Sequence, residues 1–261
     1  MATTKVIFAS DIHACHIDWM DCPTDERMQA MIRCLNAHEA DQVILLGDYA
    51  LDFWGCDRGG CWLNDGVSNT RRLAQEILPA LRHPWYMGPG NHEQYDHQTF
   101  REFTGCERQA HWVIGGYLII FCDNFCGCLA PTQHSDGEYS ATDLDRIRRL
   151  MALHPGLPVI LCGHYFDETL EPAEFFDLLR EEKRITALFC GHDHQFAVTP
   201  MGDSGVRMCH DGHFSYPHHA TLDHPTPWGF LEAELTGAGV HVRYYSDEGA
   251  VTNEAHFPLR A

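Results

Sequence analysis

Seven side chains of types that commonly bind metals follow short apolar runs of this chain, each within a few residues of the end of a run. They are Asp11, His13, Asp48, Asn91, His164, His192 and His194. A set of oxygen and imidazole ligands without a thiolate suits Mn, Fe, Zn or Ni better than Ca or a soft metal. The set is too large for one tetrahedral ion and fits two ions that share a carboxylate, about 3.5–4 Å apart. We therefore expect a site for two divalent or trivalent transition-metal ions, with manganese favoured.

The spacing of two pairs predicts that their side chains converge. One residue separates Asp11 from His13, and one residue separates His192 from His194. In an extended chain, side chains two residues apart point to the same side. By the same argument Asp193 points elsewhere, and we assign it no role. Sharp backbone turns are predicted where a glycine directly precedes a candidate, as it does at Asp48, Asn91, His164 and His192.

The elements that must hold these residues alternate short apolar runs with amphipathic segments. The apolar runs predict buried strands, at residues 5–10, 42–46, 84–88, 158–162 and 185–190. The amphipathic patterns predict helices at 24–40, 68–82, 140–153 and 171–183. Thr24 and the pair Ser140 and Asp143 are the expected N-terminal caps, Pro79 is expected to end or bend its helix, and Gly115-Gly116 to turn a hairpin. Because ligands bind beyond the carboxyl ends of strands in α/β sheets, the five strand ends predict one shared site.

We expect one domain over residues 1–261, with the metal-binding segments at 11–194 and a mainly β C-terminal part at 200–261, since a chain of this length fits a single hydrophobic core. Asp and Glu number 37 against 18 Lys and Arg, which gives a formal net charge of −19. That charge argues against long nucleic acids and anionic membranes as partners, because both bind basic surfaces. No apolar run is long enough for a membrane span, and the first residues lack the pattern of a signal peptide. We therefore expect a cytoplasmic protein.

The chain contains 12 cysteines, which a domain of this size does not need as disulfide staples. Cys162 and Cys190 end apolar runs, where cysteine acts as a small hydrophobic residue. Free, reduced thiols are the expected state. A thiol site made by Cys122, Cys126 and Cys128, and a disulfide or a metal site made by Cys56 and Cys61, remain open alternatives.

Taken singly, each of these short motifs also fits an ordinary turn, but their order along the chain is specific. The series DIH, GD, GNHE, GH and GHDH, from Asp11 to His194, resembles the five sequence blocks of the calcineurin-like metallophosphoesterases. The resemblance implies an α/β fold, a four-layer αββα sandwich of two mixed central β-sheets flanked by helices. It also implies that Asp11, His13 and His194 hold one metal, that Asp48 bridges, and that Asn91, His164 and His192 hold the second. His92 would face the leaving-group oxygen and Glu93 would orient it.

This resemblance predicts a dinuclear metal-dependent hydrolase that cleaves a phosphomonoester or phosphodiester bond of a small soluble substrate. A metal-bridging hydroxide would attack phosphorus, and His92 would act as the general acid, because histidine titrates near neutral pH. Two alternatives stay open. One is a non-catalytic scaffold with the same fold, and the other is a hydrolase of a pyrophosphate-type bond. The native metals, the preference for monoesters or diesters and the oligomeric state do not follow from the sequence.

Two long loops rich in aromatic and histidine residues, at 52–66 and 210–229, are expected to surround the site. Aromatic walls suit a nucleotide-like substrate by stacking, although the same rings equally fit a role in packing the loops onto the body. The candidates are Phe53, Trp54, Trp62, His213, Tyr216, His218 and His219. Arg58, Arg71 and Arg72 are candidate phosphate contacts, and His16 is a further candidate near the site, with a solvated surface position as the alternative for each.

Overall fold

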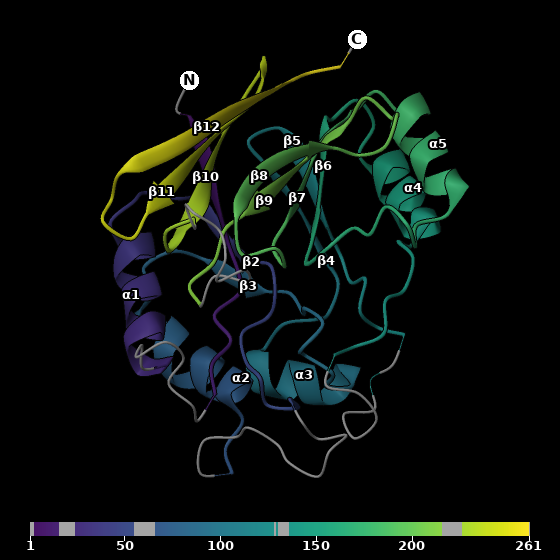
Figure 1. The fold of residues 1–261 in the computed structure, drawn as a ribbon. Coiled ribbons are helices and arrows are strands. Elements are labelled where there is room, and N and C mark those ends of the chain that lie inside the picture. Colours follow the sequence, from purple (N-terminus) through teal and green to yellow (C-terminus); the bar gives the residue numbers. More distant parts are fainter. Residues whose placement is uncertain are drawn as a thin grey trace.

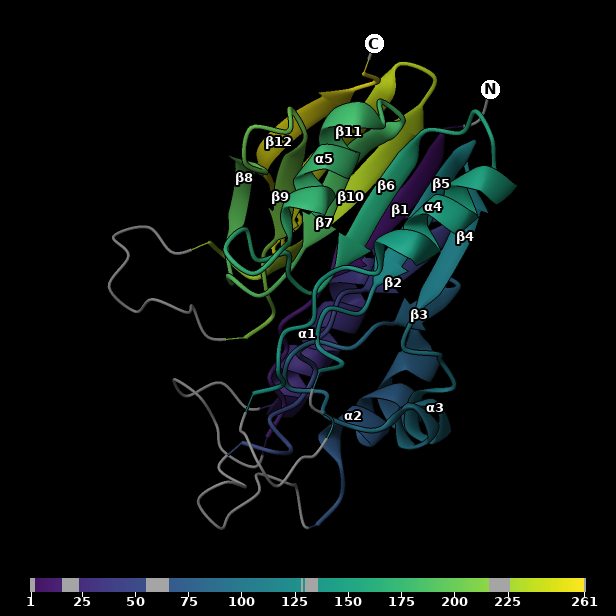
Figure 2. The ribbon, with the colours of Figure 1, turned by 90° about the vertical axis from the view of Figure 1, so that its right-hand side faces the viewer.

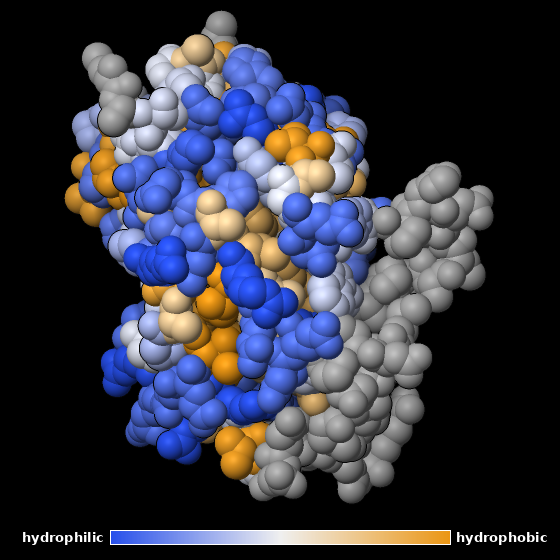
Figure 3. Space-filling model, turned by 90° about the vertical axis from the view of Figure 1, so that its left-hand side faces the viewer, coloured by the Kyte–Doolittle hydropathy of each residue, from blue (hydrophilic) through white to orange (hydrophobic). Residues whose placement is uncertain are grey.

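A computed structural model describes residues 3–15, 24–54, 66–127, 129, 136–215 and 226–260. Several residues named above lie outside these ranges, so the expectations about them stay predictions: His16, Cys56, Arg58, Cys61, Trp62, Cys128, Tyr216, His218 and His219. Within the described ranges, no helix has both the length and the apolar character needed to cross a membrane. The side of the molecule drawn in Figure 3 is mainly hydrophilic, with smaller apolar areas near its middle.

Two six-stranded sheets form the centre of the molecule, and both are mixed (Figure 1). In the first sheet β1, β2 and β3 are parallel, and β10 pairs antiparallel with β1. Its order is β12 (Val251–Pro258), β11 (Gly239–Ser246), β10 (Gly229–Thr236), β1 (Thr4–Ala9), β2 (Gln42–Leu45) and β3 (Trp85–Met87). In the second sheet β5, β6, β7 and β9 are parallel, with antiparallel edges. Its order is β4 (Ala110–Ile114), β5 (Tyr117–Cys122), β6 (Val159–Gly163), β7 (Ile185–Cys190), β9 (Arg207–Asp211) and β8 (Phe196–Pro200).

Helices cover the outer face of each sheet. On the first sheet these are α1 (Thr24–Asn36) and the helical turns after α2 (Asn69–Arg72). On the second they are α4 (Leu144–Leu153) and α5 (Ala173–Glu181), which face the viewer in Figure 2. Strand alternation builds the layers: Val6 and Phe8 pack between the sheets, whereas Ile7 packs under α1. The predicted four-layer αββα sandwich is confirmed.

The helix boundaries differ from the prediction in three places. The segment 68–82 is not one helix: α2 passes into a π-helical turn at Leu73–Ile77 and a 3-10 turn at Leu78–Ala80, where Pro79 lacks an amide hydrogen to continue the ladder. The predicted helix 24–40 ends at Asn36. Helix α4 begins only at Leu144, because Asp143 is its cap and accepts the Arg146 amide at 2.8 Å.

The sequence analysis does not predict the short helix α3 (His97–Thr104). Its signals were present, since Asp96 caps it by accepting the Thr99 amide at 2.8 Å, and Gly105 ends it with a φ of 73°. The predicted hairpin at Gly115-Gly116 joins β4 to β5, and the described residues after 200 include the strands β9 to β12.

The strands that precede the candidate ligands belong to both sheets. Strands β1, β2 and β3 lie in the first sheet, and β6 and β7 lie in the second. The carboxyl ends of these two parallel groups meet, so the site lies where the two sheets come together rather than at the edge of one open sheet.

Candidate metal centre

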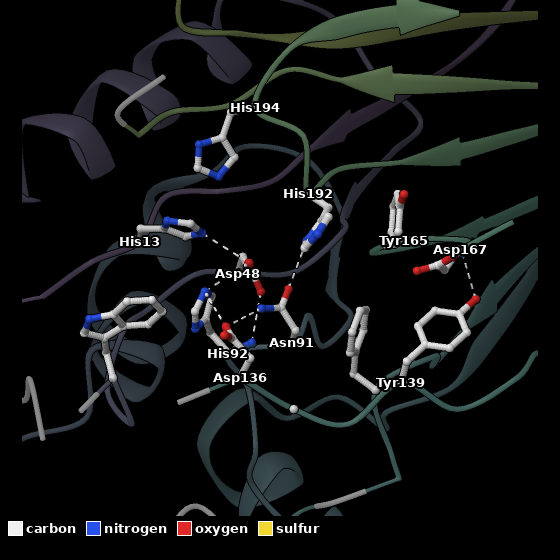
Figure 4. A pocket seen from close by; sticks show the side chains of 13 residues that line it. His13, Asp48, Asn91, His92, Asp136, Tyr139, Tyr165, Asp167, His192 and His194 are labelled. Atoms are coloured by element: carbon white, nitrogen blue, oxygen red, sulfur yellow. Dashed lines mark hydrogen bonds and ion pairs between the residues drawn. The ribbon is translucent and has the colours of Figure 1, made fainter. Parts of the chain in front are cut away.

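Three overlapping groups of candidate ligand atoms lie at this meeting point, and within each group the atoms are no more than 4.8 Å apart. The groups are Asp11, His13 and His194; His13, Asp48 and His92; and Asp48, His164 and His192. Nearly all of these side chains are buried. Figure 4 shows five of the residues in these groups, His13, Asp48, His92, His192 and His194, pointing toward a common space. The structure thus brings together all seven predicted metal ligands, with Asn91 joined to the third group by the contacts described below.

The first group is arranged around one carboxylate oxygen. Asp11 Oδ1 lies 3.2 Å from His194 Nε2 and 3.7 Å from His13 Nε2. This oxygen is buried and accepts no hydrogen bond from the described residues. A buried carboxylate oxygen that faces imidazole nitrogens fits a cation, because both kinds of atom are metal ligands.

The third group is arranged around Asp48, which also reaches the first group through His13. Asp48 Oδ2 lies 3.1 Å from His164 Nε2 and 3.2 Å from His13 Nε2. The amide oxygen of Asn91 is 2.9 Å from His164 Nε2 and 3.1 Å from His192 Nδ1. Asp48 therefore sits between the two groups, the position that a bridging ligand needs.

The backbone at the site is left-handed rather than extended, which corrects the reasoning from the spacing. The non-glycine residues with positive φ in the described ranges are all candidate ligands: Asp11 (55°), His13 (50°), Asp48 (55°), His192 (73°) and His194 (52°). Such conformations are unfavourable for residues with a Cβ and tend to occur at functional sites. The paired side chains converge because each backbone turns at the ligand itself.

The glycines before the ligands allow close packing of the backbone. Gly47 has a φ of +113°, and a Cβ there would lie 2.4 Å from the Gly90 nitrogen. A Cβ on Gly90 would lie 2.2 Å from Asp48 Oδ1. The loops after β2 and β3 therefore touch at positions where only glycine fits.

The charges of the site match those of a metal centre. Burial lowers the pKa of His13 to about 3 and that of His192 to about 4, so both imidazoles are neutral at pH 7 and have a lone pair for a cation. Burial also disfavours a charged His164, but Asp48 beside it raises its pKa to about 9. Asp48 itself is buried, yet the neighbouring His164 and His92 hold its pKa well below the usual range. A bound cation would take over the balancing charge that the His164 proton otherwise supplies.

His92 lies on the wall of the site, but Glu93 does not orient it. His92 Nε2 is 3.5 Å from Asp136 Oδ1 and 3.6 Å from Asp48 Oδ2. The Glu93 carboxylate instead accepts backbone amides, from Asp48 at 2.8 Å, Gly90 at 2.9 Å, Tyr49 at 3.0 Å and Ala50 at 3.3 Å. Glu93 thus fixes the two glycine-containing loops to each other. Consecutive residues of a turn point apart, which explains why a neighbour in sequence is not the partner of His92.

Asp136 is a site residue that the sequence did not reveal. It accepts the Asn91 side-chain amide at 2.9 Å, which directs the amide oxygen of Asn91 toward His164 and His192. It follows no strand end and belongs to no recognisable motif, so only the tertiary structure brings it here.

A second missed pair, Ser10 and Asp211, lies behind Asp11. Ser10 Oγ is 2.7 Å from Asp211 Oδ1 and also hydrogen-bonds Asp11 Oδ2. A hydroxyl has one hydrogen to donate, so one of the two carboxyl groups must itself carry a proton. Asp211 is fully buried, and burial together with the charge of Asp11 raises its pKa well above the usual range. Asp211 is therefore the neutral acid that donates to Ser10, and Ser10 donates to Asp11.

The metal-ligand groups form one wall of a cavity of about 350 Å³ (Figure 4). The cavity is lined by His13, Asp48, Trp54, Asn91, His92, Phe125, Asp136, Gly137, Tyr139, Tyr165, Asp167, His192 and His194. Trp54 is the described loop aromatic among them, with its ring centre 5.5 Å from that of His92. The cavity thus combines the candidate metal centre with a space for a small organic molecule.

Other residues singled out in the sequence lie outside the cavity lining. Phe53 packs on Tyr95, with 4.6 Å between ring centres, and His213 stacks on His194 at 5.5 Å. Arg72 pairs with Asp25 at 2.6 Å, and the Arg71 guanidinium lies over the Phe103 ring, so neither arginine is a phosphate contact here.

Asp193 points away from the metal ligands, as the spacing predicted, and lies 3.1 Å from His210 Nδ1. Among the described cysteines, Cys122 and Cys126 are free thiols, and burial raises the pKa of Cys122 to about 12. The three groups of ligand atoms contain no cysteine within the described part of the chain.

The fold and this site define a metallophosphoesterase-like protein. A family model described as calcineurin-like phosphoesterase matches residues 4–196, and the chain belongs to that family. The family binds two metal ions, and the residues present here fit such a pair. No curated protein sequence matches the chain.

Solved structures share the fold at low sequence identity. A purple acid phosphatase from yellow lupin has a TM-score of 0.64 at 12% identity; the match covers 98% of this chain and 54% of the lupin chain, so this chain spans about half of that protein. GAP50, the anchor in the inner membrane complex of Plasmodium, has a TM-score of 0.59 at 11% identity and 100% and 90% coverage. Vacuolar Protein Sorting 29 of Cryptosporidium parvum has a TM-score of 0.51 at 13% identity, with 98% of each chain covered.

Proposed function

We propose that this protein is a metal-dependent hydrolase of a phosphomonoester or phosphodiester bond in a small soluble substrate. The observation that carries the proposal is the convergence of three overlapping ligand groups on the wall of one cavity of about 350 Å³. Family membership supports a phosphoesterase in general. The reaction, the substrate and the residue roles below are our proposal.

The division of ligands follows the geometry. Asp11, His13 and His194 would hold one ion, Asn91, His164 and His192 the other, and Asp48 would contribute to both. When bound, two such ions lower the pKa of a water molecule and neutralise charge on the phosphoryl oxygens during in-line displacement. The chain itself fixes the ligands: Glu93 ties together the loops that carry Asp48 and Asn91, and Asp136 orients the Asn91 amide.

His92 is our candidate for the general acid that protonates the leaving-group oxygen. Its ring lines the cavity, and its Nε2 lies 3.6 Å from Asp48 Oδ2, close to the position where the ester would react. Asp136 Oδ1 lies 3.5 Å from the same nitrogen and would help to orient the ring at the cavity wall. Glu93 has no part in this step because backbone amides occupy its carboxylate.

An activity panel tests the proposal. Purified protein reconstituted with Mn, Fe, Ni or Zn would be assayed with p-nitrophenyl phosphate and bis-p-nitrophenyl phosphate, and the comparison of the two esters gives the preference for monoesters or diesters. We expect turnover that requires metal and disappears in Asp48→Asn. Protein with metal demonstrably bound but without turnover on any phosphoester would contradict the proposal.

That outcome would favour a non-catalytic scaffold. The observation in its favour is the Plasmodium relative of the same fold, which is described as an anchor. An intact ligand set and a cavity beside it favour the enzyme, since a scaffold requires neither. Inorganic pyrophosphate in the same panel tests the remaining alternative, a hydrolase of pyrophosphate-type bonds.

A further inference from the structure

The part of the cavity beyond the candidate metal ligands is aromatic and acidic. Four rings line it, from Trp54, Phe125, Tyr139 and Tyr165. Two carboxylates line it as well, those of Asp136 and Asp167. Among the described lining residues there is no lysine and no arginine. This composition is unusual for a site that must bind a negatively charged ester, and it constrains the rest of the substrate.

The two carboxylates lie on different sides of the metal-binding histidines. Asp136 stands next to His92, at 3.5 Å from its Nε2, and its side chain is 56% exposed. Asp167 lies near Tyr165 and Tyr139, on the side of His192 (Figure 4). Both flank the space into which an ester bound at the metals would extend.

The rings beside them are held in place by ring contacts and hydrogen bonds. Tyr165 lies over His192, with 4.6 Å between ring centres and 33° between planes. The Tyr139 hydroxyl donates to Glu171 at 2.7 Å and accepts the Asp167 amide at 3.0 Å, so these hydrogen bonds form at the edge of the ring and not on its face. Fixed ring faces next to carboxylates are the arrangement that binds ammonium groups, through cation–π attraction and opposite charge.

The charges that line the cavity disfavour a substrate that carries a second anionic group. The phosphoryl charge would be matched at the metals, so the remaining cavity meets only the rest of the substrate. A second phosphate or a carboxylate there would face Asp136 and Asp167 without a lysine or an arginine among the described lining residues. A cationic group would instead gain from both carboxylates and from the rings.

We propose, resting on the phosphoesterase function above, that the substrate is a phosphoester of a cationic alcohol, one that carries an ammonium or quaternary ammonium group. Asp136, Asp167 and the neighbouring rings form the subsite for that cation. The nucleotide-like substrate expected from the aromatic loops is the competing class, because a nucleobase would stack on the rings without bringing a positive charge to the carboxylates.

A pair of probes of equal shape isolates the charge. Phosphocholine and 3,3-dimethylbutyl phosphate differ by a quaternary nitrogen in place of a carbon. With the manganese-loaded full chain, we expect kcat/KM for phosphocholine to exceed that for the neutral ester about ten-fold, since exposure of Asp136 to solvent screens part of the attraction. Adenosine 5′-monophosphate should be a poorer substrate than phosphocholine.

Substitutions assign the preference to the two carboxylates. In Asp136→Asn and in Asp167→Asn the ratio between the two probes should fall toward one. Asp145→Asn, the same change at an exposed position of α4 outside the cavity lining, should keep the wild-type ratio. Equal rates for the two probes in the wild type, or a ratio that survives both substitutions, would overturn the proposed cation subsite.

A binding measurement separates this proposal from the proposed function. Calorimetric affinities of the same two probes for metal-loaded protein report the cation preference without turnover. Preferential binding of phosphocholine without hydrolysis of any ester would retain the cation subsite and reject the phosphoesterase. Hydrolysis of p-nitrophenyl phosphate with equal affinity for both probes, or with adenosine 5′-monophosphate preferred, would retain the phosphoesterase and reject the subsite.

Discussion

His92 is the residue for which reactivity can be separated from metal binding. In His92→Ala we expect turnover of alkyl phosphates, which are poor leaving groups, to fall by about 10²- to 10³-fold, because the leaving oxygen loses its proton donor. p-Nitrophenyl esters need no such donor and should lose less than about ten-fold. Metal content should remain at the wild-type value, and His97→Ala, at an exposed position of α3, is the matched control. Equal losses on both classes of ester would contradict the assignment.

A second prediction for a single residue concerns Asp211. A neutral acid buried behind Asp11 changes how the free energy of unfolding depends on pH. A carboxyl whose pKa is raised in the folded state contributes stability that is fully present below its unfolded pKa, about 3.9, and that is lost as the pH rises toward the folded value. Asp211→Asn keeps a hydrogen-bond donor for Ser10 but has no such loss. Its free energy of unfolding relative to the wild type should therefore rise with pH, by about 1.4 kcal/mol per pH unit, from about one unit above the unfolded pKa up to the raised pKa of the folded state.

Urea unfolding at several pH values, with a chelator in all samples, measures this difference. Asp145→Asn, the same substitution at an exposed carboxyl of α4, provides the matched control. If the difference between Asp211→Asn and the wild type is constant with pH, Asp211 is ionised in the folded protein and the hydrogen-bond direction is reversed.

At the scale of elements, the end of β7 connects the two ligand groups through one short segment. His194 belongs to the group of Asp11, and His192 to the group of Asp48 and His164. Both histidines have positive φ, so glycine removes the imidazole without adding backbone strain. We expect His192→Gly and His194→Gly each to lose one ion of two, and a different one in each variant.

Metal content after dialysis, together with the spectrum of a cobalt-substituted protein, distinguishes the two sites. His241→Ala, a partly exposed position on β11, should keep both ions. Loss of both ions in both variants, or of the same ion in each, would show that the segment does not divide its two histidines between the sites.

At the scale of the whole molecule, the candidate metal centre joins the two sheets. Asp11, His13, Asp48 and Asn91 follow strands of the first sheet, whereas His164, His192 and His194 follow strands of the second. Metal ions would therefore add links across the interface between the sheets. At a free metal concentration of about 100 times Kd, binding at one site stabilises by about 2.7 kcal/mol, which corresponds to roughly 5–10 °C in Tm for a protein of this size.

Thermal unfolding followed by circular dichroism, with and without manganese, measures this shift. The increase should grow with metal concentration and should be smaller in Asp48→Asn, which removes the ligand placed between both groups. A Tm that does not respond to metal or to chelator would exclude a metal centre between the sheets.

The sequence by itself determined the alternating strands and helices of an α/β fold and the seven strand-end ligand candidates, whereas the four-layer arrangement was implied by the resemblance to the calcineurin-like metallophosphoesterases. It did so because buried strands are continuous apolar runs, and because polar groups directly after such runs must lie at a sheet edge. It also predicted most helices and expected Pro79 to end or bend the helix at 68–82, but it missed α3 and the π-helical turn at Leu73–Ile77. These errors are local. A short capped helix and the backbone around Pro79 give only weak sequence signals, and packing decides their conformation.

Only the tertiary structure decided which groups each side chain contacts. Glu93 was predicted to orient His92, but it accepts backbone amides of two loops, and Asp136 lies beside His92 instead. Ser10 and Asp211 meet although 201 positions separate them in the chain. Hydrogen bonds and charges act over a few ångströms of space. Which groups come that close depends on how the two sheets pack, and the order of residue types along the chain does not specify that packing.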